Sequence, residues 1–188
     1  MAARKGAAAG VRPGSSGVQA REPAARYVAS PLPATQTTQV SAARTPRRAL
    51  LDVNVLIALF DADHLHHARA TAWLAANITA GWASCAITQN GCVRIMSQPG
   101  YPNSLPPAAV AQRLRVATET EHHLFVPGDL SLLDSHCFDS DQLLGHRQVT
   151  DAWLLGLAVQ HRLRLVTFDA SVPTRVVRGA TAEHVLGL

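Results

Sequence analysis

The chain has 188 residues, a hydrophobic fraction of 47% and a formal net charge of +4, enough for one ordinary domain with a real core plus an additional segment. Its pI near 9.5 points toward nucleic acid, but the charge is unevenly distributed. Residues 1–48 hold eight Lys or Arg and one acid, a net +7, whereas residues 49–188 hold nine Arg and twelve acids, a net −3. The pI is therefore weak support for a basic RNA-binding face on the body of the chain.

Cysteine usage and hydropathy favour a cytoplasmic location. Cys85, Cys92 and Cys137 contain no CxxC pair, which favours structural thiols in a reducing compartment over a disulfide framework or a zinc site. No apolar stretch approaches the roughly 18 residues of a transmembrane helix. No long apolar segment follows Arg4 and Lys5, so we do not expect a signal peptide.

Residues 1–47 are predicted to form a disordered basic extension. They are rich in Ala, Pro, Gly and Arg and contain too few large apolar side chains to offset the entropy cost of ordering. Two interpretations stay open: the extension attracts RNA or another polyanion, or it is inert and reflects a misplaced start codon. Residues 48–188 are predicted to form a single folded domain.

The body alternates strand-like and helix-like segments in chain order. Apolar runs bounded by turn residues predict strands at residues 49–51, 81–86, 123–126 and 163–167, with a final edge strand at 183–186. Helical periodicity predicts helices at residues 53–60, 63–78, 88–96, 106–121 and 151–161.

Particular residues begin the second and third of these helices. Asp63 and Thr88 are the expected N-caps. The residues expected on the inward face of the second helix are Ala68, Ala72, Leu74 and Ala75. Strands that alternate with helices predict an α/β sandwich with a mainly parallel sheet.

Three acids mark the ends of predicted elements. Asp52 and Asp169 each follow a strand, and Asp151 begins a helix. Taken singly, each acid has a structural role available, as an N-cap, a partner of the helix dipole or a turn residue. The carboxyl ends of parallel strands meet at one edge, where ligands bind. Three carboxylates gathered there repel each other unless a cation lies between them, so the set predicts a divalent-metal site.

The ordered set of motifs resembles the PIN-domain ribonucleases, and most closely the VapC-type toxins of toxin–antitoxin pairs. The resemblance rests on LDVNVLIAL at residues 51–59, HLHHARATAWL at 64–74, TQNGCVRI at 88–95, VTDAWLL at 149–155 and LVTFD at 165–169. It implies a PIN-like three-layer sandwich, with a mainly parallel central sheet flanked by helices.

The resemblance also implies the chemistry. The chain is expected to be an endoribonuclease toxin in which Asp52, Asp151 and Asp169 bind Mg²⁺ or Mn²⁺, the ions that suit carboxylate oxygens. Metal-activated water would hydrolyse an RNA phosphodiester and leave a 5′-phosphate. The implied substrate is tRNA or rRNA. The implied partners are a second copy of the chain and a VapB-type antitoxin packed on the apolar helix surface of residues 60–74.

The family pattern carries Glu where this chain has Gln89. An amide oxygen can coordinate a metal or hold a water, but it brings no charge and cannot act as a general base. Gln89 is therefore an additional ligand or water-orienting candidate. A rival interpretation follows from the same residue: a catalytically weakened PIN-like protein that binds RNA or antitoxin without cleaving.

Further candidates carry weaker signals. Asn54, Thr150 and Thr167 are candidates to orient the metal ligands or the water, with ordinary capping as the alternative. Arg94 is a candidate phosphate contact, or simply a surface arginine. His64 and His67 have the spacing of a shared helical face, which suits a transition-metal pair or a solvated surface. A metal-dependent phosphatase is disfavoured because Asn54, not a second Asp, stands two residues after Asp52.

Overall fold

A computed structural model describes residues 47–188, which include the whole predicted domain. The predicted extension lies outside the described residues, apart from Arg47. No helix within residues 47–188 is long and apolar enough to cross a membrane.

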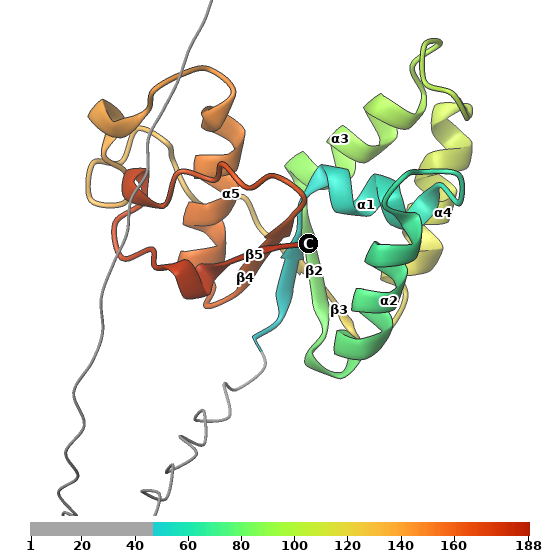
Figure 1. Ribbon diagram of the computed structural model, residues 1–188, viewed down its shortest axis with the longest axis horizontal. Helices are drawn as coiled ribbons and strands as arrows, with labels where there is room; N and C mark the ends of the chain where they lie inside the picture. Colours follow the sequence, from blue (N-terminus) through green and yellow to red (C-terminus); the bar gives the residue numbers. More distant parts are fainter. Residues whose placement is uncertain (1–46) are drawn as a thin grey trace, which may run out of the picture. The chain divides into compact units, whose positions relative to one another are not determined.

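The centre of the fold is a five-stranded sheet in the order β3-β2-β1-β4-β5 (Figure 1). The strands are β1 Ala49–Leu51, β2 Trp82–Cys85, β3 His123–Val126, β4 Arg164–Thr167 and β5 Val185–Gly187. All four neighbouring pairs are parallel. The short apolar runs therefore form strands as predicted, with β5 at an edge. β1 and β2 are buried along their whole length, as expected for a parallel sheet covered on both faces.

Helices cover the sheet on two sides, so the predicted α/β sandwich is confirmed. The helices are α1 Val53–Phe60, α2 His67–Asn77, α3 Ala86–Met96, α4 Pro107–Thr118 and α5 Gln148–Gln160. In Figure 1, α1 to α4 lie on one side of the sheet and α5 lies on the other. Alternate residues of β1 point to the two faces, so Leu50 packs in the core under α5 while Ala49 and Leu51 pack in the core under α1.

The start and the inward face of α2 differ from the prediction. The helix begins at His67 rather than at Asp63, and its fully buried residue is Ala70, whereas Ala68, Ala72 and Ala75 are exposed. The reason lies in the preceding loop. Asp61 is 8% exposed and accepts hydrogen bonds from the Tyr101 hydroxyl at 2.5 Å and from the Asn103 amide at 2.8 Å. These bonds to a distant loop hold residues 61–66 in a non-helical conformation.

Helix α3 begins at Ala86, two residues earlier than predicted. Thr88 is not the N-cap but lies in the first turn, where its Oγ1 accepts a hydrogen bond from the Cys85 backbone N–H at 3.0 Å. The threonine therefore stabilises the helix start from inside the helix, as the third residue of a capping box does.

The register of β1 and β4 places their carboxyl ends side by side. Leu51 pairs with Val166, and the Asp52 N–H donates to the Val166 carbonyl at 3.0 Å. Residues that follow these two strands therefore emerge at the same edge of the sheet.

Candidate active site at the carboxyl ends of β1 and β4

Asp52 lies at the junction of β1 and α1 and is 8% exposed. One carboxylate oxygen accepts from the Val53 N–H at 2.6 Å, which makes Asp52 the N-cap of α1. The other accepts from the Thr167 hydroxyl at 2.6 Å. Burial raises the pKa of Asp52, the bonds from Thr167 and Val53 oppose that rise, and the negative charge of Asp169 adds to it. Asp52 is therefore both the N-cap of α1 and one of the predicted site residues.

Thr167 joins the two strand ends through its hydroxyl. Its Oγ1 donates to Asp52 and accepts from the Asn54 amide and from the Asp169 N–H, both at 3.0 Å. Asn54 also accepts from the Phe168 N–H at 3.3 Å. Asn54 and Thr167 therefore fix the orientation of Asp52 and the path of the chain into Asp169.

Asp169 is exposed and forms the predicted turn. One oxygen accepts from the hydroxyl and the N–H of Ser171, at 2.6 Å and 2.7 Å. These bonds lower the pKa of Asp169. The carboxylate is consequently charged throughout the neutral range and contributes a fixed negative charge to the rim.

Asp151 lies in the first turn of α5 and is partly buried. Burial, followed by the negative charges of Asp52 and Asp169, raises its pKa to about 6. This shift shows that the three acids lie close enough to repel one another, although they come from distant parts of the sequence. The structure thus brings the predicted acids to one rim.

The carboxylate oxygens at this rim are ligands that suit a hard divalent cation, but the three side chains are not arranged around one point. Within residues 47–188, no three Asp, Glu, His or Cys side chains converge tightly enough to bind a metal ion as they stand. Each carboxylate oxygen has two lone pairs, so the hydrogen bonds on Asp52 and Asp169 leave acceptor capacity for a metal. Burial and the neighbouring charges of Asp52 and Asp169 raise the pKa of Asp151, and a cation at this rim would offset that repulsion.

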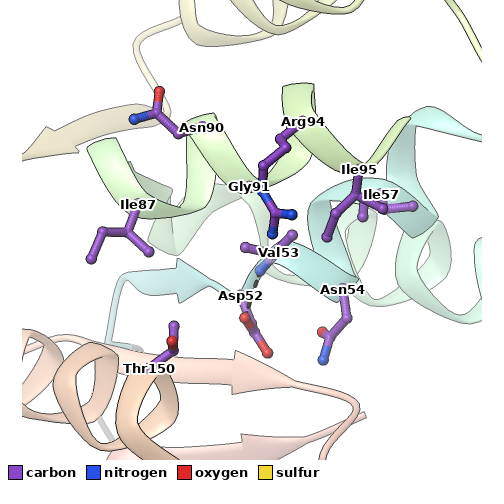
Figure 2. A pocket seen from close by; sticks show the side chains of 10 residues that line it. All are labelled: Asp52, Val53, Asn54, Ile57, Ile87, Asn90, Gly91, Arg94, Ile95 and Thr150. Carbon is purple, nitrogen blue, oxygen red and sulfur yellow. Dashed lines mark hydrogen bonds between the residues drawn. The ribbon is translucent and has the colours of Figure 1, made fainter. Parts of the chain in front are cut away.

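A pocket of about 500 Å³ opens beside Asp52, between α1 and α3 (Figure 2). Arg94 reaches from α3 toward Val53 and Asp52, and Thr150 contributes from α5. The other lining residues are Asn54, Ile57, Ile87, Asn90, Gly91 and Ile95. Thr150 and Arg94 therefore lie where a molecule bound next to Asp52 would meet them.

Gln89 does not line this pocket. Its amide donates to the Ser84 hydroxyl at 2.9 Å, and that hydroxyl lies 2.9 Å from Nε2 of His123. Gln89 instead borders a separate cavity between α3 and α4. Asn90, which follows Gln89, borders both this cavity and the pocket, but its side chain points away from Asp52 (Figure 2). The α3 side chain that reaches toward Asp52 is Arg94, which the sequence analysis named as a candidate.

His64 and His67 do not form a metal-binding pair. His67 lies in α2, where its Nδ1 is 2.7 Å from the Ala58 carbonyl. His64 precedes the helix, and its Nδ1 accepts from the His66 N–H at 3.1 Å. The two imidazoles thus have separate local partners.

A family model for the PIN domain matches residues 49–176. The chain belongs to the PIN-domain family. It is 52% identical over 141 residues to Ribonuclease VapC44 of Mycobacterium tuberculosis, an alignment that covers 75% of this chain and 99% of the relative. Ribonuclease VapC38 of the same organism is 47% identical over 127 residues, covering 67% and 88% of the two chains. Within the family, the chain therefore groups with the VapC ribonucleases.

Among solved structures, the chain is similar to the crystal structure of M. tuberculosis VapC20, which is described as a toxin that cleaves the sarcin–ricin loop. The two are 14% identical with a TM-score of 0.47, and the match covers 66% of this chain and 92% of that one.

Proposed function

We propose that the chain is a Mg²⁺- or Mn²⁺-dependent endoribonuclease toxin that hydrolyses RNA phosphodiesters and is controlled by a VapB-type antitoxin. The observation that carries the proposal is the meeting of Asp52, Asp151 and Asp169 at one rim, where burial and then the charges of Asp52 and Asp169 raise the pKa of Asp151 to about 6. The ribonuclease names of the relatives support RNA as the substrate class. As in the sequence-based expectation, tRNA or rRNA is the proposed target and the cytoplasm the proposed location.

The three aspartates would bind the metal, and neighbouring residues would position them. When bound, the metal supplies positive charge at the scissile phosphate and lowers the pKa of a water molecule. Thr167 holds Asp52 in one orientation, and Asn54 holds Thr167. Asp151 must release its proton to become a ligand. Thr150 and Arg94 lie in the adjoining pocket, where Arg94 would contact the negatively charged RNA.

The rival interpretation, a catalytically weakened protein, gains no support from the contacts of Gln89. That interpretation requires the position of Gln89, where the family pattern has Glu, to lie at the metal rim. The Gln89 amide is instead bonded to Ser84, outside the pocket that contains Asp52.

An apolar groove supports the proposed antitoxin site on residues 60–74. The groove has a volume of about 320 Å³ and lies among α1, α2 and α4, with Phe60, Thr71 and Leu74 along its wall. A second apolar surface supports the proposed homodimer. The edge strand β3 leaves Leu124 and Phe125 41% and 49% exposed, which a second copy would cover.

The proposal is tested by incubating the full chain with total cellular RNA, with and without Mg²⁺ or Mn²⁺. Asp52→Asn removes one carboxylate charge while keeping a similar shape, and we expect cleavage to fall by about 100-fold or more. Asp63→Asn makes the same chemical change on an exposed loop and is the matched control. New RNA ends are mapped by sequencing.

Two results would contradict the proposal. Cleavage that persists in excess chelator would exclude a metal-dependent reaction. Cleavage by a Gln89→Glu version, with none by the parent chain, would favour the weakened protein instead.

A further inference from the structure

We propose that the pocket beside Asp52 binds one nucleobase of the RNA, the one next to the cleaved phosphodiester, and that Arg94 reads its edge with a preference for guanine. This inference rests on the proposed ribonuclease function and extends it to sequence selectivity. It is carried by the shape of the pocket, its apolar walls and the Arg94 side chain that reaches into it from α3 (Figure 2).

The pocket has the size and walls of a small-molecule site. Its volume of about 500 Å³ falls inside the range of roughly 300–1,000 Å³ that is typical of such sites. Apolar side chains of Val53, Ile57, Ile87 and Ile95 make up much of the lining. Ile87 is 40% exposed at the surface, although it is a large apolar side chain. An unstacked RNA base has flat apolar faces that pack against such walls.

Gly91 brings α3 close enough to α1 to form the pocket. A Cβ at this position would lie 2.7 Å from Cγ2 of Val53, so any side chain would push the two helices apart. The close approach holds Arg94 over the side of the pocket that contains Asp52.

Arg94 is the polar side chain of α3 that reaches into the pocket, whereas the Asn90 side chain points away from it (Figure 2). Arg94 is exposed, and within residues 47–188 its guanidinium has no hydrogen bond or ion pair. Arginine carries donors only, in a fork that matches the two acceptors O6 and N7 of guanine. Arg94 therefore favours guanine over bases that present fewer adjacent acceptors.

A phosphate group fits this pocket less well than a base does. Phosphate binding needs positive charge and gains nothing from four apolar side chains. The acids of the rim would in addition repel an anion near Asp52. The arrangement thus separates two tasks: the scissile phosphate lies at the aspartates, and the neighbouring base enters the pocket.

The first test measures binding without cleavage. The full chain is kept in excess chelator, and fluorescent short oligouridines with a single central G, A, C or U are titrated by anisotropy. We expect the G-containing RNA to bind about tenfold more tightly than the others, the size of one good bidentate contact. Arg94→Gln should reduce that preference. Arg115→Gln removes the same charge from α4, beside a different cavity, and should leave the preference unchanged.

The second test maps the bases on either side of each cut in a random-sequence RNA, with metal present. Enrichment of G at one flanking position, reduced in Arg94→Gln, supports the inference.

Equal affinity for the four oligonucleotides overturns it, and the pocket then becomes a candidate site for an antitoxin side chain. An equal loss of affinity for all four in Arg94→Gln also overturns it, because that result describes a phosphate contact. If no RNA is cleaved but the binding preference for G is present, the proposed catalysis fails while the base pocket stands.

Discussion

At the scale of single residues, the three carboxylates at the rim differ in the direction and size of their pKa shifts. Asp169 has its pKa lowered by Ser171, whereas Asp52 has its pKa raised by burial. Asp151 is the most sensitive to its surroundings, because burial and both neighbouring charges raise its pKa to about 6. Without a cation, the raised pKa values of Asp52 and Asp151 mean that their ionised forms oppose folding, whereas the lowered pKa of Asp169 favours it.

We expect Asp151→Asn to raise the melting temperature of the metal-free protein near neutral pH. The folded state keeps a proton on Asp151 up to about pH 6, while the unfolded state loses it near the ordinary value of 3.8. Stability conferred by this group therefore falls as the pH rises through that window and stays low above it. The advantage of the Asn variant should shrink as the pH falls from about 6 toward 4, as measured by thermal melts.

A divalent cation should reverse the order of the melting temperatures of the parent chain and Asp151→Asn. A ligand that binds only the folded state stabilises it, and the ionised Asp151 carboxylate favours that binding. Saturating Mg²⁺ should therefore raise the melting temperature of the parent chain more than that of Asp151→Asn. A difference between the two proteins that is the same at every pH, with and without metal, would contradict this account.

At the scale of elements, α5 carries Asp151 and depends on close packing for its position. Gly156 lies in the middle of this helix, where a Cβ would lie 2.5 Å and 2.7 Å from two ring carbons of Phe138 and 2.9 Å from Leu130. Phe138 is 1% exposed and belongs to the core under α5. The ring cannot yield without displacing other core residues, so the distance between α5 and the sheet is fixed here.

Gly156→Ala should therefore destabilise the protein. Overpacking of this kind typically costs about 1–3 kcal/mol. Three contacts below 3 Å point to the upper end, which exceeds the helix-propensity gain of about 1 kcal/mol from Gly to Ala. Gly145→Ala adds the same methyl group where a Cβ meets no atom within 4 Å and serves as the control. Chemical denaturation of both variants measures the difference, and equal stability would exclude a packing role for Gly156.

Packing also decided which element predictions were correct. Strand β1 has the predicted bounds because a short apolar run in a covered parallel sheet is buried along its length. Strand β3 also has the predicted bounds, although it lies at an edge and buries only Val126 fully. Helix α2 lies at the surface and buries only Ala70 completely, so its alanine pattern carried little information about an inward face. Its start was set by Asp61 and its partners Tyr101 and Asn103, which no local pattern reveals.

At the scale of the whole molecule, charge is divided between the segment of residues 1–48, with a net +7, and the acidic body, with a net −3. We expect a chain that lacks residues 1–41 to keep its melting temperature, because both hydrophobic clusters of the described structure lie within residues 47–188.

RNA binding by that shortened chain should depend less steeply on salt. Each phosphate neutralised by Lys or Arg adds to the slope of affinity against salt concentration. Anisotropy titrations between about 50 and 200 mM salt compare the two proteins. Identical slopes would show that residues 1–41 make no contact with RNA, which is the inert alternative for the extension.

The sequence by itself determined the fold class and the ends of β1 and β4, after which Asp52 and Asp169 follow, since these depend on local patterns of apolar runs and turn residues. Only the tertiary structure decided what those acids and their neighbours contact. The orientation of α3 turns Gln89 toward Ser84 and Arg94, five residues later, toward Asp52. The register of β1 against β4 places Thr167 on Asp52, 115 residues away. Such contacts depend on how whole elements pack, and packing is a property of the complete chain.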